Sequence, residues 1–141
     1  MRKKIACFIA LCLLYTSCGL VINENIFGNY YLVASDTNED LCLSYHESCD
    51  GGIYGTVVTP TVFAIGYNEN YIIVKQHPRA FPNPPDKSIT NFYILPVKNG
   101  FNWRTNNGLL GPLTFDQFNQ KRKELNIPNS LNFTKEMKDL K

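Results

Sequence analysis

Short apolar and β-branched stretches, separated by polar turns, fill most of the chain between residues 28 and 97. Residues 71–77 are at first apolar on both faces, which predicts a strand in the middle of a sheet. Pro60 cannot donate to a strand ladder, so the stretch around it forms either two strands or one bent edge strand. The expected strand segments are residues 28–35, 41–46, 53–59, 61–67, 71–77 and 88–97.

One segment late in the chain has the pattern of an amphipathic helix. Phe115 and Phe118 share one face at helical spacing and are expected to pack on a sheet. Thr114 is a good N-cap, and Gln117 stands three residues later, as a capping box requires. We therefore predict a helix over residues 114–126.

A run of strands followed by a single helix indicates an α+β fold that is mostly antiparallel β-sheet. We expect a meander of five to seven short strands, with the C-terminal helix packed on the sheet. Residues 99–111 are rich in Gly and Asn and predict a long loop or a weak hairpin. The chain has 141 residues, which suits a single domain, and we expect that domain to span residues 28–141.

The first residues have the features of a secretory signal peptide. A basic cluster, Arg2 to Lys4, precedes an unbroken apolar run from Ile5 to Tyr15. This run is too short for a membrane-spanning helix, which needs about 20 apolar residues. It fits the apolar region of a signal peptide, which has about 7–15 residues. We predict a signal peptide over residues 1–17.

Cys18 follows the apolar run and two small residues, and this arrangement resembles a bacterial lipoprotein signal. The resemblance covers residues 1–18, although Tyr15 stands where that family usually has an aliphatic residue. It implies that Cys18 becomes the mature N-terminus and carries the lipid, with residues 18–27 forming the lipidated cysteine and a short tether. The absence of acidic residues directly after Cys18 favours a periplasm-facing anchor. The alternatives are a signal that is cleaved elsewhere and an apolar start that arose by chance.

The formal net charge of +2 comes from the three basic residues of the predicted signal. Without residues 1–17, the chain has one more acidic than basic side chain, a net charge of −1. Nucleic-acid-binding domains carry a basic stripe and a high pI. We therefore expect no nucleic-acid partner.

Two cysteines remain beyond Cys18 in the exported part of the chain, Cys42 and Cys49. Exported proteins are exposed to an oxidising environment, so a disulfide between these two residues is expected. A metal site with His46 as a third ligand would need a fourth ligand. Two free thiols are the third alternative.

The sequence contains no recognisable enzyme motif, cofactor fingerprint or metal-binding signature, so we expect neither catalysis nor a cofactor. Loops on a rigid scaffold often carry binding residues. In the proline-rich loop, the candidates are His77, Arg79 and Phe81. In the Gly/Asn-rich loop, they are Trp103 and Arg104, residue types that are enriched at interaction hot spots. The alternative for Trp103 is that it caps the core.

Three stretches together resemble a family of small bacterial lipoproteins catalogued only as a domain of unknown function. They are Tyr71–Pro78 (YIIVKQHP), Lys87–Val97 (KSITNFYILPV) and Gly111–Thr134 (GPLTFDQFNQKRKELNIPNSLNFT). They cover about half of the chain that follows the signal. The resemblance supports export and the extent of the domain, and it brings no active residue.

Taken together, these features predict a lipid-anchored protein of the bacterial cell envelope that acts as a non-catalytic binding module. Its expected partners are the membrane, through the N-terminal lipid, and an envelope protein or a cell-wall glycan. The alternative is a small periplasmic inhibitor or immunity-type protein that acts on an enzyme or toxin.

Overall fold

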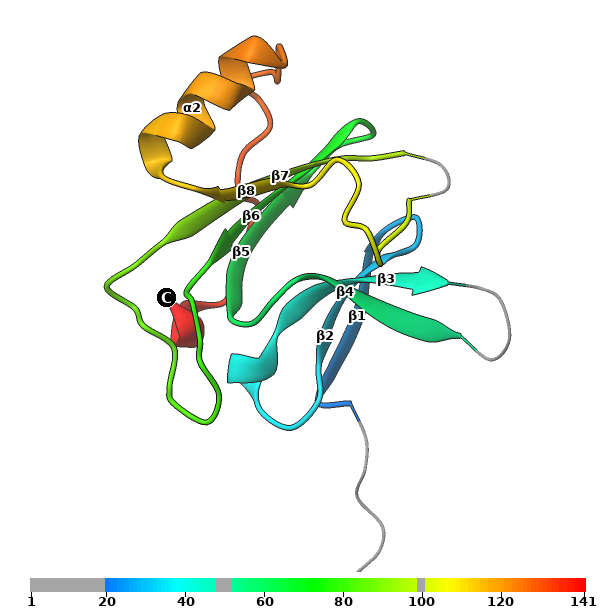
Figure 1. Ribbon diagram of the computed structural model, residues 1–141, viewed down its shortest axis with the longest axis vertical. Coiled ribbons are helices and arrows are strands. Elements are labelled where there is room, and N and C mark those ends of the chain that lie inside the picture. The colour runs from blue at the N-terminus through cyan, green and yellow to red at the C-terminus, as the bar shows by residue number, and fades with distance from the viewer. Residues whose placement is uncertain (1–19, 48–51, 99–100) are drawn as a thin grey trace, which may run out of the picture.

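The computed structural model describes residues 20–47, 52–98 and 101–141, and these residues form two antiparallel sheets and one α-helix (Figure 1). The predicted fold class is confirmed. The predicted signal peptide and Cys18 lie outside the described residues. Within the described part, no helix is long and apolar enough to cross a membrane.

Sheet A is a four-stranded meander in the order β1-β2-β3-β4. Its strands are β1 (Ile22–Phe27), β2 (Tyr30–Ala34), β3 (Cys42–Glu47) and β4 (Ile53–Val58). A 3-10 turn, η2 (Asn38–Asp40), connects β2 to β3. All the pairings are antiparallel, as short connections between consecutive strands favour.

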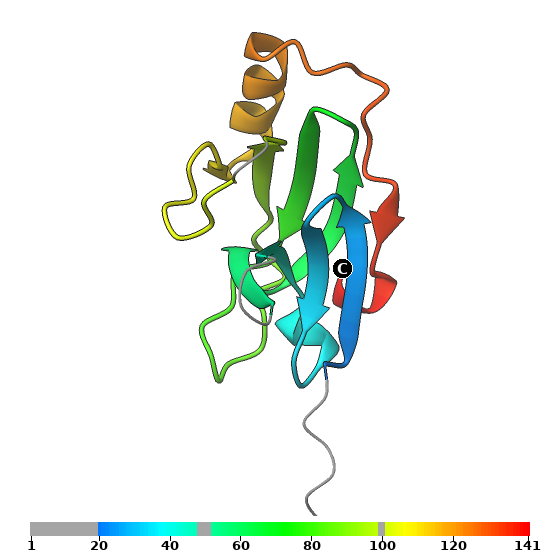
Figure 2. The same cartoon turned by 90° about the vertical axis from the view of Figure 1, so that its right-hand side faces the viewer.

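Sheet B has five strands in the order β8-β7-β6-β5-β9. They are β5 (Val62–Tyr67), β6 (Tyr71–Gln76), β7 (Asn91–Pro96), β8 (Leu110–Leu113) and β9 (Lys135–Glu136). The segment after β9 ends in a second 3-10 turn, η3 (Lys138–Leu140). Sheets A and B pack face to face, and the helix α2 (Phe115–Glu124) lies on the far side of sheet B from sheet A (Figures 1 and 2).

Sheet B is buried on both faces because its central strands alternate between two apolar clusters. On β6, Ile72 and Val74 point into the core between the sheets, while Ile73 points toward α2. The same alternation on β7 sends Tyr93 and Leu95 inward. The predicted central position of residues 71–77 is therefore confirmed, since a strand covered on both faces must be apolar on both.

The helix begins and ends close to the predicted residues. The Thr114 backbone N–H donates to Gln117 Oε1 at 2.9 Å, and the Gln117 N–H donates to Thr114 Oγ1 at 3.3 Å, which forms the expected capping box. Asn126 has a φ of +53°, and the Ile127 N–H donates to the Arg122 carbonyl at 2.9 Å. This left-handed residue ends the helix in the way that many helices end.

The predicted start of the domain and the predicted number of strands need correction. Residues 22–27, expected to belong to the tether, form β1 and pair with β2. The stretch 99–111 and the tail also contribute β8 and β9, so the sheets have nine strands in the described residues rather than five to seven. β1, β8 and β9 are each short or polar, so the hydrophobic pattern along them is weak. They become strands because each pairs with a more apolar neighbouring strand.

The predicted pairing of Cys42 with Cys49 gains no support, and Cys49 lies outside the described residues. The Cys42 thiol donates to the Val33 carbonyl at 3.3 Å, and burial raises its pKa.

The contrast between two phenylalanines of α2 gives a stability test. Phe118 is 2% exposed in the outer cluster, whereas Phe115 is 60% exposed. We expect Phe118→Ala to lower the free energy of unfolding by about 3–5 kcal/mol because it leaves a cavity. Phe115→Ala should change it by less than about 0.5 kcal/mol. Urea denaturation followed by circular dichroism measures both, and equal losses would contradict the described packing.

Candidate functional site

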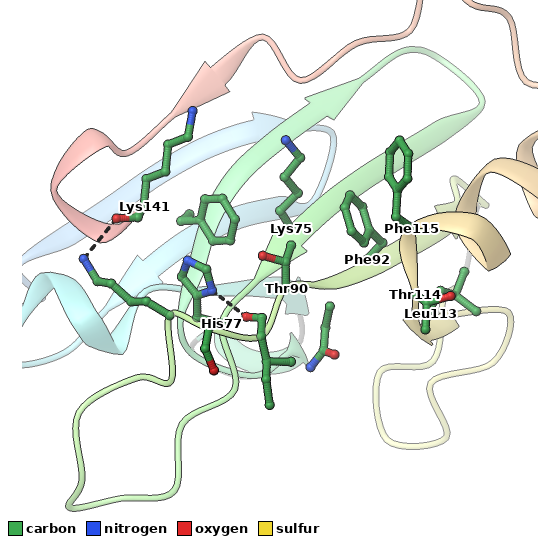
Figure 3. Close-up of a pocket in the computed structure, with 13 residues that line it drawn as sticks. Lys75, His77, Thr90, Phe92, Leu113, Thr114, Phe115 and Lys141 are labelled. Carbon is green, nitrogen blue, oxygen red and sulfur yellow. Dashed lines mark hydrogen bonds between the residues drawn. The ribbon is translucent and has the colours of Figure 1, made fainter.

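A groove lies on the outer face of sheet B, on the part that α2 and the tail leave uncovered (Figure 3). Its volume is about 640 Å³. Its walls come from four separate parts of the chain, namely β5–β6, the segment that enters β7, the start of α2 and the last residue. The lining residues are Phe63, Lys75, His77, Lys87, Ser88, Ile89, Thr90, Asn91, Phe92, Leu113, Thr114, Phe115 and Lys141.

His77 lines this groove directly after β6 and is only 3% exposed. Its ring stacks on Phe63 with centroids 4.1 Å apart and the planes 12° from parallel. Nδ1 is 2.6 Å from the Ile89 carbonyl oxygen, which can only accept, so Nδ1 is the donor. Nε2 is buried and has no hydrogen-bond partner in the described residues. A buried polar atom without a partner costs about 1–3 kcal/mol, so such atoms call for an explanation.

Three lysines line the groove, and no acidic residue does. Lys75 Nζ is 3.9 Å from one oxygen of Glu136, and Lys141 Nζ is 3.3 Å from the other. Lys87 Nζ donates to the main-chain oxygens of Asp139 and Lys141 at 3.2 and 3.1 Å. Glu136 thus pairs with two ammonium groups, and the Lys141 oxygen that Lys87 contacts belongs to the main-chain carboxylate of the last residue in the structure. The three ammonium groups of the groove therefore face two carboxylates in the described residues, which leaves an excess of one positive charge.

An aromatic surface forms the other end of the groove. The Phe92 ring is almost buried in the outer cluster and lies 5.6 Å from the Phe115 ring, centroid to centroid. Phe115 and Leu113 flank the N-cap of α2, and Figure 3 shows Phe92 and Phe115 side by side. Helical spacing predicts that Phe115 packs on the sheet beside Phe118, and this prediction holds only in part, since the Phe115 ring contacts Phe92 of β7 but is 60% exposed. The first residue of α2 lies beyond the covered part of sheet B, which leaves its ring exposed.

Comparison with known proteins identifies the family to which the chain belongs. The model of the family described as "Protein of unknown function (DUF3997)" matches residues 27–139. The chain belongs to this family. No curated protein matches the chain, and no solved structure does. The predicted membership of a family catalogued as a domain of unknown function is therefore confirmed.

The DUF3997 domain carries two other predicted binding residues, Arg79 and Phe81, outside the groove. Arg79 Nη1 lies 2.6 Å from Asp40 Oδ1, and its Nε donates to the Asn83 carbonyl at 3.0 Å. The Asp86 N–H closes the base of this loop on the Pro78 carbonyl at 2.9 Å. The loop is therefore held firmly, and it presents Phe81, whose side chain is 84% exposed.

Trp103 and Arg104 of the DUF3997 domain lie on sheet A, away from the groove. The Trp103 Nε1–H donates to a Glu47 carboxylate oxygen at 3.3 Å, and Arg104 Nη1 is 3.1 Å from the same atom. Trp103 covers Gly55 so closely that a Cβ there would lie 1.9 Å from the indole ring. Trp103 packs against the core together with buried Phe101, as the alternative expectation proposed. The five predicted residues thus fall at three separate locations.

His77 is the one lining residue that the sequence singled out for binding, and the charged and aromatic residues that it missed include Lys75, Lys87, Phe92, Phe115 and Lys141. Lys75 was detectable, because a lysine two residues before His77 in an apolar strand must share a face with it. Lys141 could not be predicted from the sequence, since its position depends on the path of the tail around sheet B. In the described residues, no cluster of three His, Cys, Asp or Glu side chains could hold a metal ion.

The ion pair between Arg79 and Asp40 makes stability depend on pH. Burial alone would raise the pKa of Asp40, but hydrogen bonds from the Thr37 and Asp36 N–H groups and from Arg79 lower it. The ionised carboxylate therefore stabilises the fold above the ordinary pKa of 3.8. This contribution is lost as the pH falls through the lowered pKa.

We expect Asp40→Asn to lower the free energy of unfolding at about pH 6, and the difference from the wild type to shrink toward about pH 2.5. Urea denaturation at the two pH values tests this. Glu39→Gln is the matched control, since Glu39 is 3.6 Å from Arg79 and its side chain is 44% exposed. A difference that grew as the pH fell would contradict the assignment.

Proposed function

We propose that the chain is a lipid-anchored protein of the bacterial cell envelope, facing the periplasm, whose domain is a non-catalytic binding module with the groove as its binding site. The observation that carries this proposal is the groove itself. Its volume of about 640 Å³ lies within the range of about 300–1,000 Å³ that is typical of small-ligand sites. It combines an apolar floor with a few convergent polar groups, as such sites do.

The arrangement around His77 supports binding rather than catalysis. A histidine that activates a nucleophile lies within hydrogen-bond reach of it. In the described residues, Nε2 of His77 has no such neighbour, and Nδ1 is occupied by the Ile89 carbonyl. The Ser88 hydroxyl, also in the groove, donates to Asp86 Oδ1 at 2.5 Å and is not hydrogen-bonded to His77.

The start of the domain supports the anchor. β1 begins at Ile22, four residues after Cys18. Four residues of extended chain reach at most about 14 Å. A lipid on Cys18 would thus hold the domain close to the bilayer surface. Leu20 and Val21 are about half exposed just before β1 and could contact the lipid headgroup region.

A second candidate function, inhibition of an enzyme or toxin, is favoured by the loop that carries Phe81. Arg79 and the Pro78–Asp86 closure hold this loop in one conformation. A preorganised loop loses little conformational entropy on binding. An exposed aromatic side chain at its tip would suit a cleft in a partner enzyme.

Lipidation can be tested by metabolic labelling with an alkyne fatty acid in a bacterial host that expresses the full chain. We expect the wild-type chain to take up the label and Cys18→Ser to lose it, because the lipoprotein pathway acylates only that cysteine. Cys12→Ser is the matched control and should stay labelled. Label that persists in the Cys18→Ser variant would refute the anchor.

Ligand binding in the groove can be tested by native mass spectrometry of the full chain extracted from host membranes. We expect a non-covalent ligand on the wild type that is lost in Thr90→Trp, which fills the middle of the groove. Phe81→Ser is the control outside the groove. Loss of a bound protein in Phe81→Ser, with Thr90→Trp unaffected, would instead support inhibition.

A further inference from the structure

Provided that the groove binds a ligand, as proposed above, its lining also defines the chemical class of that ligand. We propose that the groove binds an amphiphilic anion. The acidic head group lies at the end formed by Lys87, Lys141 and His77, and the apolar body lies over Phe92 and Phe115.

The two ends of the groove differ in chemistry (Figure 3). Lys141 and His77 lie at one end of the view, Phe92 and Phe115 lie at the other, and Lys75 stands between them. The basic end is formed by the end of β6 and the tail, whereas the aromatic end is formed by β7 and the start of α2. A ligand that fills the whole groove therefore needs a charged part and an apolar part.

The charge of the basic end favours an anion. Lys75 and Lys141 share the carboxylate of Glu136, and Lys87 Nζ donates to the Asp139 carbonyl and to the main-chain carboxylate of Lys141. An acidic head group would supply a third carboxylate, or a phosphate, to these three ammonium groups. Charge-assisted hydrogen bonds of this kind are about twice as strong as neutral ones. A cationic ligand of the same shape would gain no such bond and would meet the excess positive charge of the groove.

The unpartnered nitrogen of His77 adds a requirement for a hydrogen-bond donor. Because Nδ1 donates to the Ile89 carbonyl, Nε2 of the neutral ring is an acceptor. It has no donor in the described residues, and the side chain is 97% buried, since its exposed fraction is 3%. A hydroxyl next to the acidic group of the ligand would supply that donor. A hydroxy acid should therefore bind more tightly than the plain acid.

The apolar body of the ligand is indicated by an apolar side chain that the described residues leave exposed to solvent. Phe115 is 60% exposed and lines the groove beside Phe92. Covering this ring with hydrocarbon would remove apolar surface from water, which stabilises a complex in proportion to the area covered. The body can come from two sources, either an acyl chain released from the membrane or a soluble aryl acid.

The experiment is equilibrium dialysis with the full chain reconstituted in nanodiscs of uncharged phospholipid, with empty discs as the blank. The probes are radiolabelled octanoate, 3-hydroxyoctanoate, 4-phenylbutyrate and octyltrimethylammonium. We expect saturable binding of octanoate at about one molecule per chain and none of the cation. The 3-hydroxy acid should bind about 2–10-fold more tightly, the effect of one net hydrogen bond. The ratio of octanoate to phenylbutyrate affinity distinguishes the two sources.

Matched variants locate the binding. Phe115→Ser and Lys87→Gln should each weaken octanoate binding about 3–10-fold, since each removes one contact at the edge of the groove. Phe81→Ser and Lys123→Gln, an exposed pair outside the groove, should leave it unchanged. Equal binding of the cation, or equal effects of the two pairs of variants, would overturn the proposal.

The outcome also separates this inference from the proposed function. If no probe binds while mass spectrometry still finds a ligand that Thr90→Trp removes, the ligand belongs to another class and the binding function stands. If neither experiment finds a ligand in the groove, both proposals fail.

Discussion

Burial of sheet B on both of its faces is the constraint on which the rest of the structure depends. The inner face of β6 packs against sheet A through Ile72 and Val74, and its outer face packs against Phe118 through Ile73. A ten-residue helix is about 15 Å long, which is too short to cover the whole outer face of a five-stranded sheet. The groove is the part of that face that remains open, so its position follows from the length of α2 and the path of the tail.

The same constraint explains why the groove combines groups of different polarity. Strand residues on the outer face follow the period of two, so the row that begins with Ile73 continues through Lys75 to His77. The outer face is packed with apolar side chains only where α2 covers it. Beyond the end of α2, the polar residues Lys75 and His77 of this row face the groove. The Lys75 ammonium lies over the Phe133 ring, with Nζ 4.4 Å from its centroid. A lysine in this cation–π position interacts with an aromatic face through its charge.

The local signals of the sequence predicted the fold well, but they predicted the candidate site only in part. The caps of α2 and the strands from β2 to β7 depend on near neighbours, such as Thr114 and Gln117, and were predictable. β8 and β9 exist because distant partners pair with them, and the alignment of His77 with Lys141 depends on how the tail wraps. Periodicity could not tell Phe115 from Phe118, because the end of the covered surface is a property of the whole fold.

The core between the sheets joins residues from opposite ends of the domain. Ile26 of β1 and Leu140 of η3 are buried in the same cluster, and Lys135 of β9 forms an ion pair with Glu24 of β1. Contacts between residues so far apart in the sequence carry a large loop-closure cost in entropy. During synthesis the domain can complete its core only when residue 140 has become available.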